Sequence, residues 1–165
     1  MSCADRHGNL VALTLTHGGS FGAQVAVEEL GLTLGHGMSR FNPRPGHPNS
    51  PGPGKRPLNN MCPTVVLREG QPVLALGGAG GVRIPNAIFD VLTNFVVRGL
   101  PLEDSVQSPR LHVTGGLGLD LSNDWPAAEA DYLRQIGFKA KPGPSARVGA
   151  VAFDSKRRDA RATLR

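Results

Sequence analysis

The residues most able to do chemistry form a glycine-rich run, Gly77-Gly-Ala-Gly-Gly81, between an apolar stretch and a helical pattern. Successive glycines let backbone N–H groups converge into an anion-binding turn, and a helix that begins directly after them adds partial positive charge. The run lacks the Gly-Lys-Ser/Thr ending of a phosphate loop, and Arg83 stands where a dinucleotide-binding loop needs its third glycine. The spacing leaves two interpretations open, an anion-binding turn and a tight strand-to-helix corner.

A second candidate is Ser20, which lies in Gly18-Gly-Ser-Phe-Gly22 and so matches the G-x-S-x-G pattern of serine hydrolases. In those enzymes the serine stands on a strand-to-helix turn. Here the pattern from Phe21 to Val27 is typical of an extended segment, and short motifs of this kind arise easily in glycine-rich chains. We therefore rank a serine esterase last among the possible functions.

Thr14 and Thr16 alternate along a strand-like segment, opposite the apolar side chains of Val11, Leu13 and Leu15. From the residues alone, the two threonines are interpreted as side chains that fill a β surface.

The remaining reactive side chains indicate no metal or cofactor. The five histidines show no H-x-x-x-H or H-x-H spacing, and the two cysteines form no C-x-x-C motif. Cys62 lies in an apolar run and is expected to be a small core residue. His112 is expected to have a structural role.

The elements that must position these residues follow from periodicity and turn signals. Strands are expected at 9–16, 21–27 and 148–153, with a β-hairpin at 63–68 and 72–76. Helices are expected after Pro85, ending at Gly99, over 102–107, and from Asp124 to Gly137 with Leu133 and Ile136 facing inward. Strands in antiparallel runs and helices in a block predict an α+β layered fold.

Length and composition predict a single domain, 1–165, with a Pro/Gly-rich loop at 35–57 and a basic tail at 156–165. The net charge is +5, and the tail is expected to be solvated because no aromatic residues alternate with its cations. Nucleic-acid binding is therefore not expected. No apolar stretch reaches the ~18 residues that a membrane span needs.

The order and spacing of several short motifs resemble the small, C-terminal subunit of the γ-glutamyltranspeptidase family. The segments that carry the resemblance begin with Asp5-x-x-Gly8-Asn9 and Thr14-x-Thr16, and continue with Phe21-Gly22, Lys55-Arg-Pro-Leu58, Met61-x-Pro63-Thr64, Gly80-Gly81 and Pro109-Arg110. Each motif is weak alone, but together they cover nearly the whole chain.

The resemblance implies a four-layer αββα sandwich of N-terminal-nucleophile hydrolases, built with a large N-terminal subunit cut from the same precursor. It implies a small-molecule amide substrate and no cofactor. Thr16 would help to activate a Thr nucleophile that uses its own α-amine as base, and Gly80 and Gly81 would donate N–H groups to the oxyanion. The alignment of Asp5 to Asn9 puts that nucleophile upstream of Met1, so we expect this chain alone to be inactive.

Substrate-binding positions depart from the family pattern. Arg40 stands where the family uses an Asp to hold the γ-glutamyl ammonium, Gly18 and Gly37 replace polar ligands, and Asn59 and Asn60 replace a Ser-Ser pair that binds the α-carboxylate. A guanidinium repels an ammonium, which leads to the hypothesis that Arg40 attracts an acyl group bearing a carboxylate.

Two functional hypotheses remain from the sequence. The first is γ-glutamyltransferase-like acyl transfer or amide hydrolysis, with this chain as the small-subunit part. The second is a non-catalytic half-domain or binding module of the same family. The sequence indicates no compartment: periplasmic or secreted if a signal precedes the large subunit, otherwise cytoplasmic.

Overall fold

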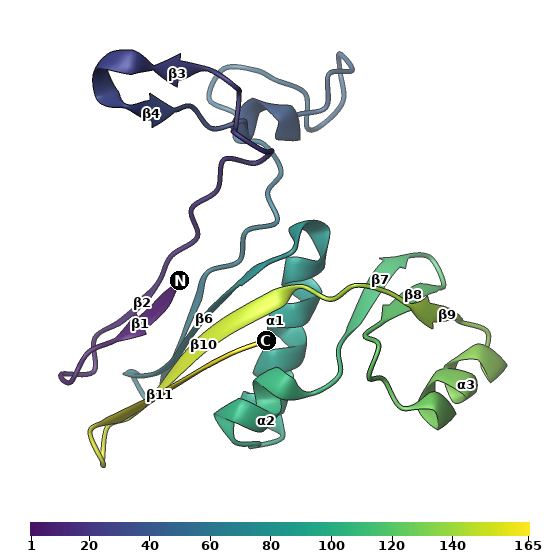
Figure 1. The fold of residues 1–165 in the computed structure, drawn as a ribbon. Helices are drawn as coiled ribbons and strands as arrows, with labels where there is room; N and C mark the ends of the chain where they lie inside the picture. Colours follow the sequence, from purple (N-terminus) through teal and green to yellow (C-terminus); the bar gives the residue numbers. More distant parts are fainter. The chain divides into compact units, whose positions relative to one another are not determined.

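The computed structural model describes all residues, 1–165, and divides them into two compact units. The main unit comprises Met1–Thr14 and Asn60–Arg165, and the loop unit comprises Leu15–Asn59. Antiparallel sheets dominate the chain, and the first two α-helices follow one another in a block, which confirms the expected α+β class (Figure 1).

The main unit is built on an antiparallel four-stranded sheet with the order β11-β10-β6-β5. Its strands are β5 (Thr64–Arg68), β6 (Gln71–Ala79), β10 (Arg147–Asp154) and β11 (Asp159–Leu164). The predicted β5–β6 hairpin is confirmed. Glu69 and Gly70 connect it with φ of 52° and 77°, and a turn with two positive φ values matches the twist of the flanking strands.

Helices cover one face of this sheet (Figure 1). Helix α1 (Ile84–Leu92) continues as the π-helical segment η4 (Thr93–Val97), and α2 (Leu102–Gln107) follows. The helix predicted between Pro85 and Gly99 corresponds to α1 and η4: Pro85 occupies the first turn of α1, and Gly99, with a φ of 69°, follows the end of η4. Helix α2 was also predicted. The core between helices and sheet is formed by fully buried apolar side chains, including Leu74, Leu76, Ile88, Val91, Val106 and Val148. Cys62 packs at its edge, as expected.

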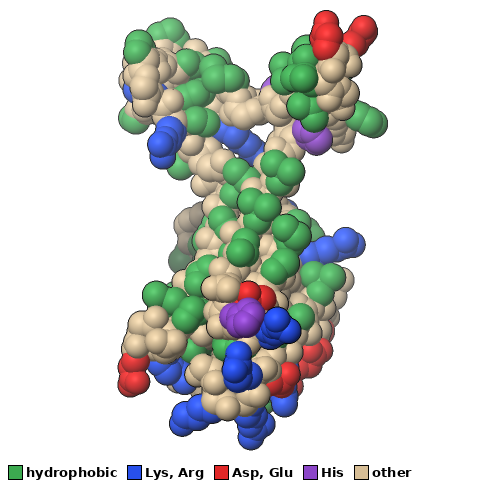
Figure 2. Space-filling model, turned by 90° about the vertical axis from the view of Figure 1, so that its left-hand side faces the viewer, with side chains coloured by type: hydrophobic (Ala, Val, Ile, Leu, Met, Phe, Trp, Pro, Cys, Tyr) green, Lys and Arg blue, Asp and Glu red, His purple; other side chains and the backbone are tan.

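A short hairpin, β1 (Ser2–Ala4) with β2 (Leu10–Ala12), contacts β6 and β10. Ala75 and Val151 alternate with the core residues of their strands, so they point to the side opposite the helices, and both are buried. The strand predicted at 9–16 is shorter than expected, since β2 covers only Leu10–Ala12. Val11 and Leu13 are 52% and 48% exposed, and hydrophobic side chains gather on the face of the main unit in view in Figure 2.

A second small sheet, with the order β7-β8-β9, was not predicted. It consists of β7 (Leu111–Gly115), β8 (Gly118–Leu121) and β9 (Lys139–Pro142), with α3 (Ala127–Gln135) connecting the parallel pair β8 and β9. Leu133 packs against its core, as expected. Ile136 is 53% exposed, contrary to the prediction, because α3 ends at Gln135 and releases the next residue into a turn.

The loop unit contains β3 (Ala26–Val27) paired with β4 (Leu32–Thr33), and two 3₁₀ turns, η1 (Glu28–Leu30) and η2 (Gly37–Arg40). The extended segment predicted at 21–27 is wrong over most of its length. Phe21 and Gln24 each have a φ of 57°, which turns the chain twice before β3 begins.

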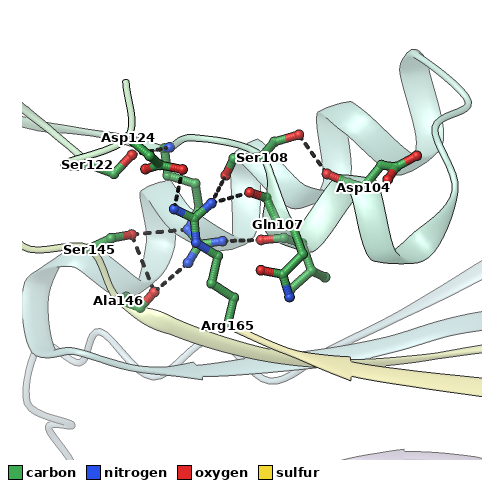
Figure 3. Close-up of polar contacts among 10 residues, drawn as sticks. Asp104, Gln107, Ser108, Ser122, Asp124, Ser145, Ala146 and Arg165 are labelled. Atoms are coloured by element: carbon green, nitrogen blue, oxygen red, sulfur yellow. Dashed lines mark hydrogen bonds and ion pairs between the residues drawn. The ribbon is translucent and has the colours of Figure 1, made fainter. Parts of the chain in front are cut away.

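The basic segment 156–165 is not simply a solvated terminus, because six of its residues form β11. Arg165 anchors its end (Figure 3) by donating to the carbonyl oxygens of Gln107 and Ser108 and to Asp124 Oδ2. None of the helices in residues 1–165 is long and apolar enough to cross a membrane.

Candidate active site

The glycine-rich run is shared between a strand and a turn. Gly77, Gly78 and Ala79 continue β6 and pair with β10, so the run does not lie wholly between the strand and the helix, contrary to what the sequence indicated. Only Gly80 and Gly81 form the corner before η3 (Gly81–Arg83) and α1. The amides that open this helical segment have no acceptor within it, so the corner presents N–H donors and the positive end of a helix dipole.

Steric and backbone constraints both require glycine at position 80. Gly80 has a φ of 150°, and a Cβ there would lie 2.7 Å from both Cα and Cβ of Ala146. Gly81 has a φ of 64° but more space, because the nearest atom to an added Cβ is Asn60 Nδ2 at 3.9 Å.

Asn60 therefore lies beside Gly81, and its side chain has an unsatisfied donor. Its Nδ2 is buried and has no hydrogen-bond partner. Leaving such a donor unpaired costs about 1–3 kcal/mol, which a ligand oxygen at this position would recover. The backbone corner and the amide of Asn60 together form a candidate site for a carboxylate or a developing oxyanion.

Arg110 holds the segment that packs on Gly80. Its side chain is 3% exposed and donates to Val106 O at 2.5 Å, Ala146 O at 3.0 Å and Ser145 Oγ at 3.1 Å. The guanidinium fixes the backbone of Ala146, and Ala146 in turn fixes the turn at Gly80. Burial, and then the nearby Arg165, lower the pKa of Arg110 from its usual value. The sequence identified Pro109-Arg110 as a motif without assigning this role.

Asp90 on α1 is a partly buried carboxylate with few partners. Its Oδ2 accepts a hydrogen bond from Leu111 N at 3.2 Å. Burial raises the pKa of Asp90 to about 6, and this effect outweighs the Leu111 hydrogen bond and the charge of Arg110, which both lower it.

We predict that Asp90→Asn stabilises the protein at neutral pH. The raised pKa means that the folded state binds a proton more tightly than the unfolded state, so the wild-type loses stability as pH rises from about 4 through about 6. A shift of this size corresponds to about 3 kcal/mol, which solvent screening of a partly exposed group reduces to about 1–2 kcal/mol. Urea unfolding at pH 3.5 and pH 7.5 should show a gain only at the higher pH. Asp131→Asn on the exposed side of α3 is the control, and a loss of stability at pH 7.5 in Asp90→Asn would contradict the assignment.

The loop unit holds Thr16, Arg40 and Asn59. Thr16 Oγ1 accepts from Gly18 N at 3.0 Å, which leaves its hydroxyl proton available to another acceptor. Arg40 ends η2 and is exposed. Asn49 links two of these segments, since its Nδ2 donates to Arg40 O at 2.8 Å and its Oδ1 accepts from Leu58 N at 3.0 Å. Sequence reasoning did not identify Asn49, which lies in a Pro/Gly-rich loop without periodicity.

The structure thus gathers the predicted site residues into two groups. Asn60, Gly80 and Gly81 meet in the main unit. Arg40 and the segment before Asn59 are joined in the loop unit, which also carries Thr16.

Other candidates are not part of these groups. Ser20 is exposed in a turn that leads to β3, so no strand-to-helix elbow forms there. His112 Nδ1 lies 2.8 Å from Asn86 Oδ1, a structural contact within the main unit. No cluster of three or more His, Cys, Asp or Glu side chains suited to a metal ion occurs in residues 1–165.

The chain is similar in sequence to part of several curated proteins. The acylase ACY 1 proenzyme of Pseudomonas sp. strain SE83 is 35% identical over 93% of this chain and 28% of its own length. The glutathione hydrolase proenzyme of Escherichia coli K12 is 35% identical over 67% of this chain and 21% of its own length. The chain thus spans about a quarter of the length of these curated relatives.

The chain is also similar to solved structures. A threonine-to-alanine mutant of Helicobacter pylori γ-glutamyltranspeptidase superposes with a TM-score of 0.85 and 28% identity, covering 100% of this chain and 96% of the other. The γ-glutamyltranspeptidase family pattern matches residues 1–165. This match and the similarity to the curated relatives show that the chain belongs to the γ-glutamyltranspeptidase family.

Proposed function

We propose that this chain is the small-subunit part of an enzyme that cleaves an amide by acyl transfer. The observation that carries the proposal is the Gly80-Gly81 corner with the unpaired amide donor of Asn60 beside it. Hydrogen-bond donors that are fixed before reaction stabilise the negative charge that develops on the carbonyl oxygen when an amide is attacked. The charge stabilisation would come from this chain without a metal or organic cofactor.

The nucleophile in this proposal is a threonine outside residues 1–165. In the β1–β2 hairpin Ser2 pairs with Ala12, and Met1 exchanges hydrogen bonds with Leu13, both at 2.9 Å. If the strand that contains Ser2 continued upstream of Met1 in the same register, the third residue before Met1 would lie opposite Thr16. A threonine there, as the first residue of a mature subunit, would use its own α-amine as base and receive a hydrogen bond from Thr16.

The reaction then proceeds in two steps. The threonine hydroxyl attacks the amide carbon while the N–H groups of Gly80 and Gly81 bind the oxyanion, and the amine leaves with the transferred proton. Water or an acceptor amine then attacks the acyl ester and releases the threonine.

A large partner from the same precursor is part of this proposal. Val11, Leu13 and Val65 leave apolar surface open on the side of the sheet away from the helices. Contiguous apolar surface of this kind is typical of an interaction face. The curated relatives are proenzymes of several times this length, and the remainder of such a precursor would cover the face.

We expect Thr16→Ala to lower turnover by the full-length enzyme about tenfold to a hundredfold, because a hydrogen bond to a group that gains charge contributes about 1.5–3 kcal/mol. Thr16→Ser should retain most of the activity, since it keeps the hydroxyl. Thr14→Ala is the matched control, because Thr14 faces Gly77 within the main unit. Equal losses in Thr14→Ala and Thr16→Ala would refute a specific role for Thr16.

Arg40 should set the choice of acyl group, which is tested with two substrates that differ only in the α-amino group. We expect glutaryl anilide to be cleaved at least tenfold more efficiently than γ-glutamyl anilide, because Arg40 repels the ammonium. Arg40→Asp should reverse this preference, and Arg44→Asp is a control in the same loop. Efficient turnover of γ-glutamyl anilide by the wild-type would overturn the specificity. No turnover of either substrate by the full-length protein would favour the non-catalytic alternative.

A further inference from the structure

We propose that a groove beside α1 binds a free α-amino acid with an apolar side chain. The groove has a volume of about 400 Å³ and lies between α1, η4, the 108–109 turn and the start of α3. Its polar and aromatic lining includes Phe89, Asp90, Asn94, Arg98, Trp125 and Glu129. Pockets that enclose small ligands begin at about 300 Å³, so the space suits a single amino acid. None of these residues belongs to the Gly80-Gly81 corner.

One of the residues that line the groove, Trp125, carries an unsatisfied hydrogen-bond donor. The indole Nε1 of Trp125 is buried and makes no hydrogen bond. A buried N–H without an acceptor costs about 1–3 kcal/mol, and native structures retain few of them. A ligand that offers an oxygen to this N–H would remove the penalty.

Charges of opposite sign lie about one helical turn apart on one wall. Asp90, Asn94 and Arg98 follow one another at intervals of four residues, and Arg98 Nη1 reaches back to donate to Asn94 Oδ1 at 2.9 Å. The guanidinium is therefore drawn to the level of Asn94, about 5–6 Å along the axis from Asp90. Glu129 adds a second carboxylate on the facing element. The ammonium and the carboxylate of one α-amino acid are close enough to pair with Asp90 and with the Arg98 guanidinium at the same time.

The wall itself has an unusual backbone. Thr93 and Asn94 open the π-helical segment η4, and Leu100 N donates to Asn94 O at 3.0 Å beyond it. Single π-helical turns within α-helices are rare and are often found at functional sites. Here the wider turn lies where the helix lines the groove.

These observations assign each part of the ligand. The carboxylate accepts from Trp125 Nε1 and pairs with Arg98, and the ammonium pairs with Asp90, whose burial makes its charge costly without a cation. The apolar side chain packs against Phe89, which is 66% exposed without it. Pro109 and Pro126 complete the apolar part of the lining.

Calorimetric titration of the full-length protein tests the proposal with three probes of similar shape. We expect L-leucine to bind, and 4-methylpentanoate and 3-methylbutylamine, which lack the ammonium and the carboxylate respectively, to bind at least tenfold more weakly. A charge-assisted hydrogen bond contributes enough to account for a factor of about ten. Absence of leucine binding at 10 mM (roughly the weakest affinity that such contacts predict), or equal binding of either analogue, would overturn it.

Variants locate the binding. Asp90→Asn keeps the acceptor for Leu111 N but loses the charge, and Trp125→Phe keeps an aromatic ring, smaller than indole, but loses the N–H. Asp90→Asn and Trp125→Phe should each weaken leucine binding about tenfold. Asp131→Asn on α3 should not change it. Arg40→Asp separates this groove from the proposed acyl-transfer site. Leucine binding that depends on Arg40 rather than on Asp90 would refute the proposal, whatever the catalytic activity proves to be.

Discussion

Replacing Gly80 by alanine is expected to lower turnover about 10²–10³-fold and to destabilise the protein by several kcal/mol. Alanine keeps the backbone N–H but forces the turn to move, so the loss of activity corresponds to displacement of one preorganised oxyanion donor. The loss of stability has two causes in the structure. A Cβ at position 80 would lie 2.7 Å from Ala146 Cα, a backbone atom that cannot rotate away, and a φ of 150° is strained for any residue with a side chain. The measurements are turnover by the full-length enzyme and urea unfolding.

Gly81→Ala is the matched control for this prediction. Gly81 also has a positive φ, of 64°, but the nearest atom to an added Cβ lies 3.9 Å away. The left-handed conformation costs about 1–2 kcal/mol for alanine, so Gly81→Ala should lose less stability than Gly80→Ala. Equal and small losses of stability in both variants would show that the corner does not require glycine at position 80.

Much of the fold could be predicted because the signals are local. The hairpin of β5 and β6 is specified by alternating apolar residues and a short turn, and α1 by its helical periodicity between Pro85 and Gly99. Helix α2 has the bounds expected from the sequence, Leu102–Gln107. In each case the pattern that forms the element is complete within about fifteen residues, so no distant contact is needed to recognise it.

The missed elements depend on distant partners. Strands β7 and β8 are short, contain glycines and are stabilised by pairing with each other and with β9 after a helical crossover. Segment 21–27 has strand-like composition, but the pairing of Ala26 and Val27 with β4 limits the strand to two residues. Strand β11 was not recognised because its charged residues leave no run of alternating apolar side chains. The segment forms a strand by pairing with β10.

The candidate site was predictable in composition but not in geometry. The resemblance identified Gly80, Gly81 and Asn60, yet nothing in the sequence indicated that the Asn60 side chain lies beside Gly81 with an unpaired donor. The supporting residues Asn49 and Arg110 act through backbone carbonyls. Such contacts depend on the position of an acceptor that every residue possesses, so no residue pattern marks them in advance.

Replacing Arg110 by methionine is expected to destabilise the protein by about 3–5 kcal/mol. Methionine fills much of the same space but donates nothing, so Val106 O and Ser145 Oγ would lose the hydrogen bond from Arg110, and Ala146 O would keep only the longer one from Ser145 Oγ at 3.4 Å. Each buried acceptor left without a donor costs about 1–3 kcal/mol. Arg134→Met is the control: this arginine also donates to a carbonyl, Ala140 O at 3.0 Å, but its side chain is 45% exposed and water can replace it.

The same substitution should also affect the glycine corner, which distinguishes a positioning role from a purely structural one. Without Arg110 the backbone of Ala146 is free to shift, and Ala146 packs directly on Gly80, so turnover should fall through kcat under conditions where the variant remains folded. Arg110→Lys should recover part of both losses, since it keeps one donor and the charge. The pKa of Asp90, which the charge of Arg110 lowers, should rise in Arg110→Met and stay nearer its wild-type value in Arg110→Lys. A folded Arg110→Met variant with unchanged kcat would show that the corner is held in place by other contacts.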